Sequence, residues 1–420
     1  RLSKSRLYTP KRRPTMDAST NTIDNDLSKE IAGEFPGTAQ GTYLSACTRG
    51  LLPASARTAL DAHLEDLTNG RTNKAGLFTM QEDVRKRFAD LIGAQSEEIA
   101  FTKNVSDGLN MIAASIAMEP GDNVVVTLSL EHPNNVYPWL NQRARRGVNV
   151  KTIPHNNGHI DIDAMIAAID ERTKVVTLPT VSFSPGFRSD AKRLGKVCRE
   201  RGVFLLVDAV QSVGVLHTDV EDMLVDGLAT STQKGMCGLY GMGFLYCRTE
   251  WATRIEPAYL ARFSVDLGPD AHEATMGDDN YGLLPDARRF DLGNYNFPAT
   301  TVAQQSLIVL SNVGTQRIEQ HVMNLSHRFI DGLLEYDLPV SGGAFGAHSS
   351  HIVSIGNMTD SQSSTDDDAL MSFSEHLTQA DVIHTVRRGM LRFAFHVYNS
   401  MDDVDHVLAL TKEWRASNAT

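Results

Sequence analysis

The chain has 420 residues, a length that favours two or three domains, or one large α/β domain with a smaller partner. Acidic and basic residues are interspersed and the net charge is −11, so we expect neither nucleic acid nor a membrane as a partner. No apolar run reaches the roughly 18 residues of a membrane span. Four widely separated cysteines without metal-ligand spacing predict a reduced, cytoplasmic protein with no metal site.

The first fifteen residues differ from the rest because they contain six basic residues and no acid. We interpret residues 1–15 as a tail, either an added or upstream-translated segment or an Arg-rich targeting peptide. The remainder is predicted to divide into an N-terminal segment over 16–45, a large ligand-binding domain over 46–300 and a small C-terminal domain over 301–420.

From about residue 80 the sequence alternates between helical and strand patterns. Gly93 is predicted to end the first helix and Ser106 to cap the second. Short apolar strands between helices indicate a buried, mainly parallel sheet, and therefore a doubly wound α/β fold whose ligand binds at the carboxyl ends of the strands. The predicted helices are 81–92, 106–118, 135–146, 161–170 and 190–201, and the predicted strands are 98–102, 123–128, 148–153, 174–179 and 203–207.

The pattern changes after about residue 300. A long helical stretch is followed by strands and helices in mixed order, which predicts a smaller α+β domain. Its expected elements are helix 301–335, a strand near 351–355, a polar loop over 359–368, a helix, strand 390–397 and helix 401–415.

The segment VFLLVDAVQSVG at 203–214 predicts a strongly apolar strand that ends at Asp208. A carboxylate at this strand end faces the ligand crevice, where pyridoxal phosphate needs an acid to keep its pyridine nitrogen protonated. Gln211 is then placed to reach the phenolic oxygen of the ring. Taken alone, the pattern is better explained by an aspartate that caps the next turn.

Lys234 follows the next short strand, which ends at Ser231, and lies in a Gly-rich turn. A lysine that carries pyridoxal phosphate as a Schiff base must be rigid and partly desolvated. Ser231 and Gln233 flank it and are predicted to bind the phosphate. An exposed loop lysine is the commoner case for any single lysine, but the pairing with Asp208 on successive strand ends favours the cofactor.

A second phosphate contact is predicted in FTKNVSDGLN at 101–110, which has the pattern strand, turn, helix. The free N–H groups at a helix start bind anions, so Val105 and Ser106 would offer backbone N–H groups and Ser106 its hydroxyl. Any capped helix has a similar pattern, so this signal is not specific.

Four segments together resemble the class V aminotransferase family of fold-type I pyridoxal-phosphate enzymes. They are DAVQS at 208–212, STQK at 231–234, EHPNNVYPW at 131–139 and RFDLGNYN at 289–296. The resemblance covers about residues 40–415 and is closest to the branch of selenocysteine lyases, cysteine desulfurases and isopenicillin N epimerases. It implies a large doubly wound domain, a smaller C-terminal domain and a homodimer with shared active sites.

The resemblance also implies roles for individual residues. His132 matches the residue that stacks on the pyridine ring and assists proton transfer, although a histidine that caps a turn before Pro133 fits too. Asn294 matches a polar residue that reaches the phosphate of the neighbouring subunit. Arg392 matches the arginine that binds the substrate α-carboxylate, as a bidentate guanidinium can. The alternative for Arg392 is a surface arginine on a strand.

The sequence departs from the desulfurase pattern at three places. Desulfurases carry a cysteine on a loop before the arginine strand, but no cysteine follows Cys247 here. Gln233 replaces a common histidine, and Phe183, near the substrate, replaces an asparagine close to the ring. We therefore predict an enzyme acting at the Cα of an amino acid, a lyase that breaks C–S bonds by β-elimination or an aminotransferase. A racemase or epimerase is the alternative, ahead of a desulfurase or a non-catalytic pyridoxal-phosphate-binding protein.

Overall fold

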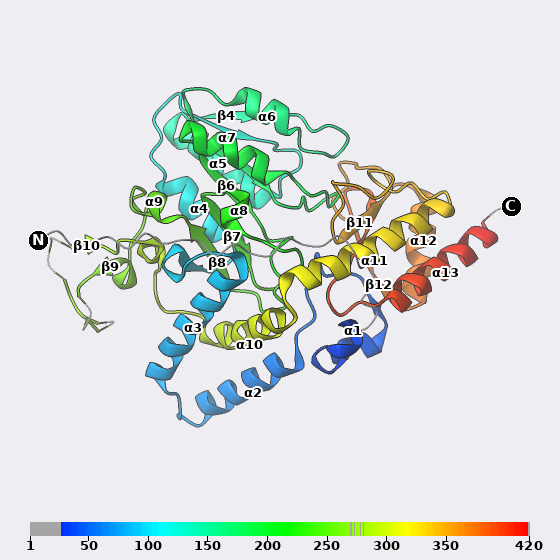
Figure 1. Cartoon of the computed structure of the whole chain (residues 1–420), viewed down its shortest axis with the longest axis horizontal. Coiled ribbons are helices and arrows are strands. Elements are labelled where there is room, and N and C mark those ends of the chain that lie inside the picture. The colour runs from blue at the N-terminus through cyan, green and yellow to red at the C-terminus, as the bar shows by residue number, and fades with distance from the viewer. Residues whose placement is uncertain (1–26, 269–270, 273, 278, 280, 419–420) are drawn as a thin grey trace, which may run out of the picture.

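The computed structural model describes residues 27–268, 271–272, 274–277, 279 and 281–418, so the predicted tail at 1–15 lies outside it. Its largest described sheet has seven strands in the order β4, β3, β5, β6, β7, β8, β2 (Figure 1). In chain order the strands are β2 (Ile99–Thr102), β3 (Asn123–Val126), β4 (Asn149–Thr152), β5 (Thr173–Pro179), β6 (Phe204–Asp208), β7 (Gly227–Ser231) and β8 (Gly243–Cys247).

The sheet is mainly parallel, as predicted. Strands β4, β3, β5, β6 and β7 pair in parallel, and β8 runs antiparallel to both β7 and β2. Successive residues of β6 enter different cores: Phe204 and Leu206 pack on one face of the sheet, and Leu205 and Val207 on the other. Because both faces are covered, the central strands are apolar without alternation.

Helices surround this sheet, and the N-terminal ends of two of them open towards the edge formed by the carboxyl ends of the parallel strands. The helices are α1 (Leu27–Glu30), α2 (Ala54–Thr68), α3 (Lys74–Ile92), α4 (Val105–Ser115), α5 (Pro133–Arg146), α6 (Ile162–Ala168), α7 (Ala191–Arg201), α8 (Val220–Met223), α9 (Thr249–Ala252) and α10 (Phe297–Val313). Short 3₁₀ turns lie at Ala32–Glu34, Pro36–Gln40, Ser96–Glu98, Arg262–Ser264 and Ala287–Phe290. Two short strands, β9 (Val265–Asp266) and β10 (Gly282–Leu283), pair antiparallel.

Two helix starts differ from the prediction. Helix α3 begins seven residues earlier than expected, where the side chain of Asn73 accepts a hydrogen bond from the backbone N–H of Gly76. It ends before Gly93 as predicted, with that glycine at φ 72°. The cap of α4 is Asn104, whose side chain accepts from Asp107 N at 3.0 Å, so the prediction of Ser106 as the cap is wrong. Asparagine is one of the residue types most favoured at a helix N-cap, and here the Asn104 side chain accepts the capping hydrogen bond from Asp107 N.

The C-terminal part contains a three-stranded antiparallel sheet in the order β11, β14, β13. The predicted helical stretch 301–335 is two helices, because Gly314 at φ 89° interrupts it. Figure 1 shows α11 and α13 side by side, and the two helices pack against each other. The elements are α11 (Thr315–Glu335), β11 (Ile352–Ile355), α12 (Asp368–Gln379), β12 (Val382–Ile383), β13 (Thr385–Arg387), β14 (Met390–Ala394) and α13 (Met401–Ser417).

The N-terminal segment packs on the C-terminal part. Strand β1 (Thr42–Tyr43) pairs in parallel with β12, and Ser45 forms a bridge with Ala394 next to it. Residues just after this bridge therefore pass between the two sheets. Over the described residues, no helix has the length and apolar character that would cross a bilayer.

Candidate active site

Asp208 and Lys234 lie at the same edge of the large sheet. Asp208 is the last residue of β6, and β7 beside it ends at Ser231, three residues before Lys234. The turn that carries the lysine is rigid, because a side chain at Gly235 would place its Cβ 2.4 Å from the carbonyl oxygen of Val213. The predicted proximity of the aspartate and the lysine follows from the parallel order of their strands.

The Lys234 amine is largely enclosed and forms no hydrogen bond or ion pair with any residue that the structure describes. Burial lowers its pKa below that of an ordinary lysine, while the negative charge of Asp208 works in the opposite direction. A lysine with a lowered pKa supplies a neutral amine more readily, which a nucleophile needs. The alternative of an exposed loop lysine does not agree with this burial.

The Asp208 carboxyl is only 3% exposed. One oxygen accepts a hydrogen bond from Val210 N at 3.0 Å, and the backbone carbonyl accepts one from Thr180 N, also at 3.0 Å. Burial raises the pKa of Asp208, and the Val210 N–H and Lys234 oppose that rise. Asp208 thus caps the turn that follows β6, which was the alternative to a cofactor contact in the sequence analysis. Its other carboxyl oxygen is available to a ligand at the strand end.

His132 caps helix α5 and also contacts Phe183. Its Nδ1 accepts a hydrogen bond from Asn134 N at 3.3 Å at the start of α5, and its ring meets the ring of Phe183 edge-on at 5.3 Å. Burial, followed by the positive charges of Lys234 and two arginines, lowers the pKa of His132 to about 4. The imidazole is therefore neutral at physiological pH, and a flat neutral ring suits stacking on a pyridine.

Arg392 projects from the central strand of the C-terminal sheet and is 2% exposed, so it is not a surface arginine. Its Nε donates to Thr385 Oγ1 at 3.3 Å, and its guanidinium also donates to the carbonyl oxygen of Phe183. Within the described chain no carboxylate lies at ion-pair distance from it. A buried guanidinium without an anion is arranged to receive one.

The residues predicted to bind a phosphate lie at the start of α4 and the end of β7. Val105 N donates to Ser231 Oγ at 2.7 Å, so this N–H group is already engaged and the Ser231 hydroxyl keeps its own hydrogen for another acceptor. Ser106 is half-buried one residue further into the helix. Gln233 is half-buried beside Lys234, and its backbone carbonyl accepts from Gly50 N at 3.0 Å.

Gln211 connects the strand end to the N-terminal segment. Its Nε2 donates to the carbonyl oxygen of Cys47 at 3.2 Å, while its Oε1 is buried without a partner among the described residues. The thiol of Cys47 is buried and lies 4.0 Å from Thr385 Oγ1. The sequence did not indicate Cys47 or Thr385, because neither belongs to a motif or to the regular α/β pattern.

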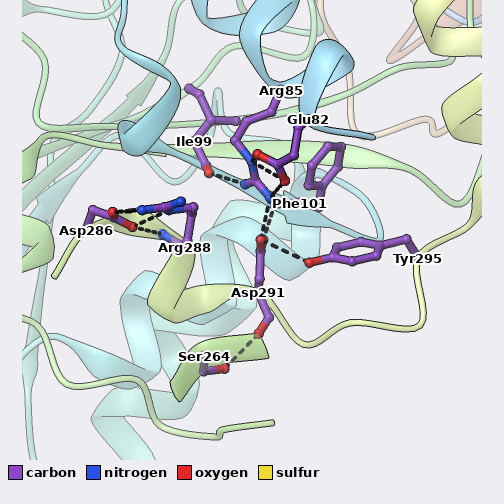
Figure 2. Close-up of polar contacts among 9 residues, drawn as sticks. All are labelled: Glu82, Arg85, Ile99, Phe101, Ser264, Asp286, Arg288, Asp291 and Tyr295. Atoms are coloured by element: carbon purple, nitrogen blue, oxygen red, sulfur yellow. Dashed lines mark hydrogen bonds and ion pairs between the residues drawn. The ribbon is translucent and has the colours of Figure 1, made fainter. Parts of the chain in front are cut away.

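The segment at 289–296 is held by a buried network (Figure 2). Asp291 accepts hydrogen bonds from Arg85 Nη2 at 2.7 Å, from Phe101 N at 2.8 Å and from the Tyr295 hydroxyl at 3.2 Å. Asn294 is exposed at the tip with φ 46°. Among the described residues, no hydrogen bond joins Asn294 to the site just described. The structure therefore does not bring it together with the other predicted residues of the same subunit.

No group of three or more His, Cys, Asp or Glu side chains that could hold a metal ion occurs among the described residues. The expected absence of a metal site is left as a prediction.

Comparison with known proteins gives consistent matches over nearly the whole chain. The family model "Aminotransferase class-V" matches residues 68–407. A probable cysteine desulfurase of Pyrococcus abyssi is 28% identical over 400 residues, covering 92% of this chain and 97% of that protein. An uncharacterized aminotransferase of Bacillus subtilis, YcbU, is 27% identical over 382 residues, covering 91% and 96%.

Solved structures agree with these matches. The apo structure of a cysteine desulfurase from Thermococcus onnurineus NA1 is similar with a TM-score of 0.79 and 26% identity, covering 93% of this chain and 98% of that one. The cystine C–S lyase C-DES, in complex with its reaction product cysteine persulfide, has a TM-score of 0.77 at 22% identity, covering 90% and 99%, and shows the fold alone. The fold is that of the fold-type I pyridoxal-phosphate enzymes. The chain belongs to the aminotransferase class-V family, as the resemblance of its four segments predicted.

Proposed function

We propose that the chain is a pyridoxal-phosphate-dependent lyase that breaks a C–S bond in a sulfur-containing amino acid. The proposal rests mainly on Arg392, whose buried guanidinium has no carboxylate partner among the described residues. The positive charge of Arg392 also lowers the pKa of Lys234, so the two side chains face the same site. An amino acid held through its carboxylate at Arg392 would present its Cα to this lysine. The C–S part of the proposal is supported by the names of relatives.

Family membership implies pyridoxal phosphate, and the residues present fit it. The fit rests on two observations. Gln211 Oε1 is buried without a hydrogen-bond partner among the described residues, and burial lowers the pKa of Lys234, as a nucleophilic amine requires. Lys234 would hold the cofactor covalently, and Asp208 would face the pyridine nitrogen. When bound, the cofactor supplies an electron sink for negative charge that develops at Cα. The other contacts are assigned to His132 at the ring, Gln211 at the phenolic oxygen, and Ser106, Ser231 and Gln233 at the phosphate. Val105 N, which donates to Ser231 Oγ, would orient that hydroxyl instead of binding the phosphate itself.

The roles of the protein groups in the reaction follow from their positions. Arg392 binds and orients the substrate carboxylate with its planar fork of donors. Lys234, which would hold the cofactor, is also the base that would remove the proton from Cα of the substrate. The electron pair of the Cβ–S bond leaves with sulfur, which takes up a proton. Overall, an S-substituted cysteine and one water give a thiol, pyruvate and ammonia.

Cysteine desulfurase is the second candidate. The names of the Pyrococcus abyssi and Thermococcus onnurineus relatives favour it, and this moves it ahead of racemase or epimerase in our ranking. The sequence argues against it, because the chain has no cysteine after Cys247 and so none on a loop before Arg392 that could take up sulfur. An aminotransferase is favoured only by family membership.

The reaction is tested by incubating the holoenzyme with cystine, with S-alkyl cysteines and with cysteine. Without added keto acid, the proposal expects pyruvate in equal amount with cysteine persulfide from cystine, and in equal amount with thiol from S-alkyl cysteines. Alanine as the product would make the chain a desulfurase, product formation that requires a keto acid would make it an aminotransferase, and exchange at Cα with inversion would make it a racemase. Each of these outcomes overturns the lyase proposal. Borohydride reduction should fix the cofactor on the peptide that contains Lys234, and Lys234→Ala is the control that should take no label.

A further inference from the structure

A second arginine projects from the same face of the C-terminal sheet as Arg392. In this sheet Thr385 of β13 pairs with Arg392 of β14, and Thr385 Oγ1 accepts a hydrogen bond from Arg392 Nε at 3.3 Å, so their side chains share one face. Side chains alternate along a strand, so Arg387, two residues after Thr385 in β13, projects from that face as well. Two guanidinium groups therefore lie on one side of two neighbouring strands.

This face of the sheet is turned towards the candidate active site. Arg392 donates to the carbonyl oxygen of Phe183, whose ring contacts His132. In the turn after β13, Arg388 Nη1 donates to the carbonyl oxygen of Ser129 at 2.5 Å, only three residues before His132. The turn that follows Arg387 is thus attached to the segment that carries His132.

Arg387 itself has no anion. Its side chain is half-buried, and among the described residues its guanidinium takes part in no hydrogen bond or ion pair. Burial is the main cause of the lowered pKa values of His132 and Lys234, and the positive charge of Arg387 adds to it. Two unpaired cations on one wall of a site repel each other and attract a ligand that has two negative charges.

We propose that Arg387 determines substrate specificity by binding a second anionic group, a carboxylate on the sulfur substituent of the cysteine, while Arg392 binds the α-carboxylate. This inference rests on the proposed function and narrows its substrates to S-substituted cysteines that have a negative charge beyond the sulfur. The second carboxylate leaves with the thiol, so Arg387 acts on binding and takes no part in the bond that breaks. A neutral substituent of the same size leaves the guanidinium without its charged partner.

The test compares two substrates of nearly the same shape, S-carboxymethylcysteine and its neutral amide, S-carbamoylmethylcysteine. Because a hydrogen bond to a charged group is stronger than a neutral one, the holoenzyme should show a kcat/KM about 10- to 100-fold higher for the carboxylate. In Arg387→Met this preference should disappear, with little change for the amide. Arg387→Glu should reverse it, because a negative side chain repels the carboxylate.

Arg328→Met is the matched control. Arg328 is an exposed arginine on α11 whose ion pair with Asp405 lies at the surface, so its replacement should leave the preference for the carboxylate unchanged.

A binding measurement separates specificity from effects on the reaction. Adipate has the chain length of S-carboxymethylcysteine but no amine and no sulfur, so it cannot react. Calorimetric titration of the wild-type holoenzyme should show tighter binding of adipate than of its monoamide, and Arg387→Met should bind the two compounds about equally. The comparison within the wild type holds whatever the stability of the variants.

Equal kcat/KM for the two cysteines in the wild type, or a preference for the carboxylate that persists in Arg387→Met, overturns the inference. The proposed function would still stand as long as pyruvate forms. If neither cysteine gives pyruvate, the proposed function is refuted instead, and the comparison of adipate with its monoamide then decides whether Arg387 binds an anion.

Discussion

Arg392 combines two demands that normally conflict, since it is almost fully buried and yet is needed as a free cation. Its guanidinium keeps two protein acceptors, Thr385 Oγ1 and the carbonyl of Phe183, and these fix its orientation without neutralising it. Burial lowers the pKa of Arg392, although an arginine stays charged at any physiological pH. A substrate carboxylate therefore gains a pre-oriented donor that is not shielded by water.

The variant Arg392→Lys tests this role. Lysine keeps the charge but loses the planar fork, so we expect the KM for the amino acid to rise about 10- to 100-fold, corresponding to the loss of one charge-assisted hydrogen bond. Cofactor affinity should change little. Steady-state kinetics and equilibrium dialysis of the cofactor measure the two effects. Unchanged KM together with weakened cofactor binding would place Arg392 at the phosphate or in the fold rather than at the substrate.

His351 gives a pH-dependent contribution to stability. It is 1% exposed beside the C-terminal sheet, and burial, with smaller effects of His396 and Arg392, lowers its pKa to about 3. Because the unfolded chain takes up this proton near pH 6.5, the neutral form stabilises the fold fully above pH 6.5. This contribution is lost as the pH falls from 6.5 towards 3, by about 1.4 kcal/mol per pH unit.

The difference in the free energy of unfolding between wild type and His351→Gln should accordingly shrink by about 2 kcal/mol between pH 6.5 and pH 5. Urea unfolding at a series of pH values measures it. His406→Gln, at an exposed position on α13, is the matched control. A difference that does not depend on pH would show that His351 is not buried in its neutral form.

At the residue scale, the sequence identified the groups that belong to short, chemically distinctive segments. Asp208 was predicted at the end of an apolar strand and Lys234 in the turn after the next strand, while Arg392 was predicted from the family resemblance. Arg387 was not among the predicted site residues, because an arginine at a strand end normally lies in solvent. What turns it towards the site is the register of β13 with β14, which no local pattern records.

Among the elements, the loop before α10 is held by the buried network around Asp291, in which Arg85 is the charged partner. Arg85 in α3 and Asp291 are each about 3% exposed or less, and the guanidinium also donates to Ile99 O at 2.6 Å (Figure 2). Replacing Arg85 leaves the buried Asp291 carboxylate with two neutral donors, Phe101 N and the Tyr295 hydroxyl, but without an opposite charge. Arg85→Met should therefore lower the free energy of unfolding by about 3–5 kcal/mol.

Chemical denaturation checks this value, and two variants serve as controls. Lys86→Met removes an exposed ion pair with Asp90 on the same helix and should cost about 1 kcal/mol or less. Adding Asp291→Asn to Arg85→Met removes the uncompensated charge and should recover part of the loss. If Arg85→Met lowered the free energy of unfolding no more than Lys86→Met, the ion pair between Arg85 and Asp291 would not stabilise the loop before α10.

The elements were predicted best where the pattern of apolar residues agrees with the glycine that ends the element. The strands β2 to β7 and the end of α3 at Gly93 follow the apolar runs and the glycine that breaks them. The start of α3 was missed because its first turn contains Gly76 and few apolar residues, so only its cap, Asn73, marks it. The separate helices α10 and α11 were merged, since a single Gly314 inside an apolar helical pattern is often tolerated.

For the whole molecule, the unanswered prediction is the homodimer. Asn294 is exposed at the tip of a loop whose base is fixed by Asp291, and the class-V resemblance assigns it to the phosphate of a neighbouring subunit. If each subunit completes the other's site, cofactor binding and association are linked by mass action. Dilution should then release the cofactor, and Asn294→Ala should weaken both cofactor binding and the dimer.

Analytical ultracentrifugation with absorbance detection measures cofactor binding and dimer formation in one experiment. Asn69→Ala, at the exposed end of α2, is a control of the same type. A monomer that holds the cofactor as tightly as the dimer would remove the basis for a shared site.

The hydrogen bond between Arg392 and Phe183 spans 209 residues of sequence, and the bond between Ser231 and Val105 spans 126. Contacts between residues this far apart in sequence form late in folding, because closing the long loop between them costs chain entropy before the contacts can stabilise it. The sheet can gain its secondary structure before the two halves of the site meet. In refolding experiments, cofactor absorbance should therefore recover more slowly than far-UV circular dichroism. Between the recovery of circular dichroism and that of cofactor absorbance, the chain would have its sheet but not its substrate site. A chain that binds the cofactor during this interval would bind amino acids poorly.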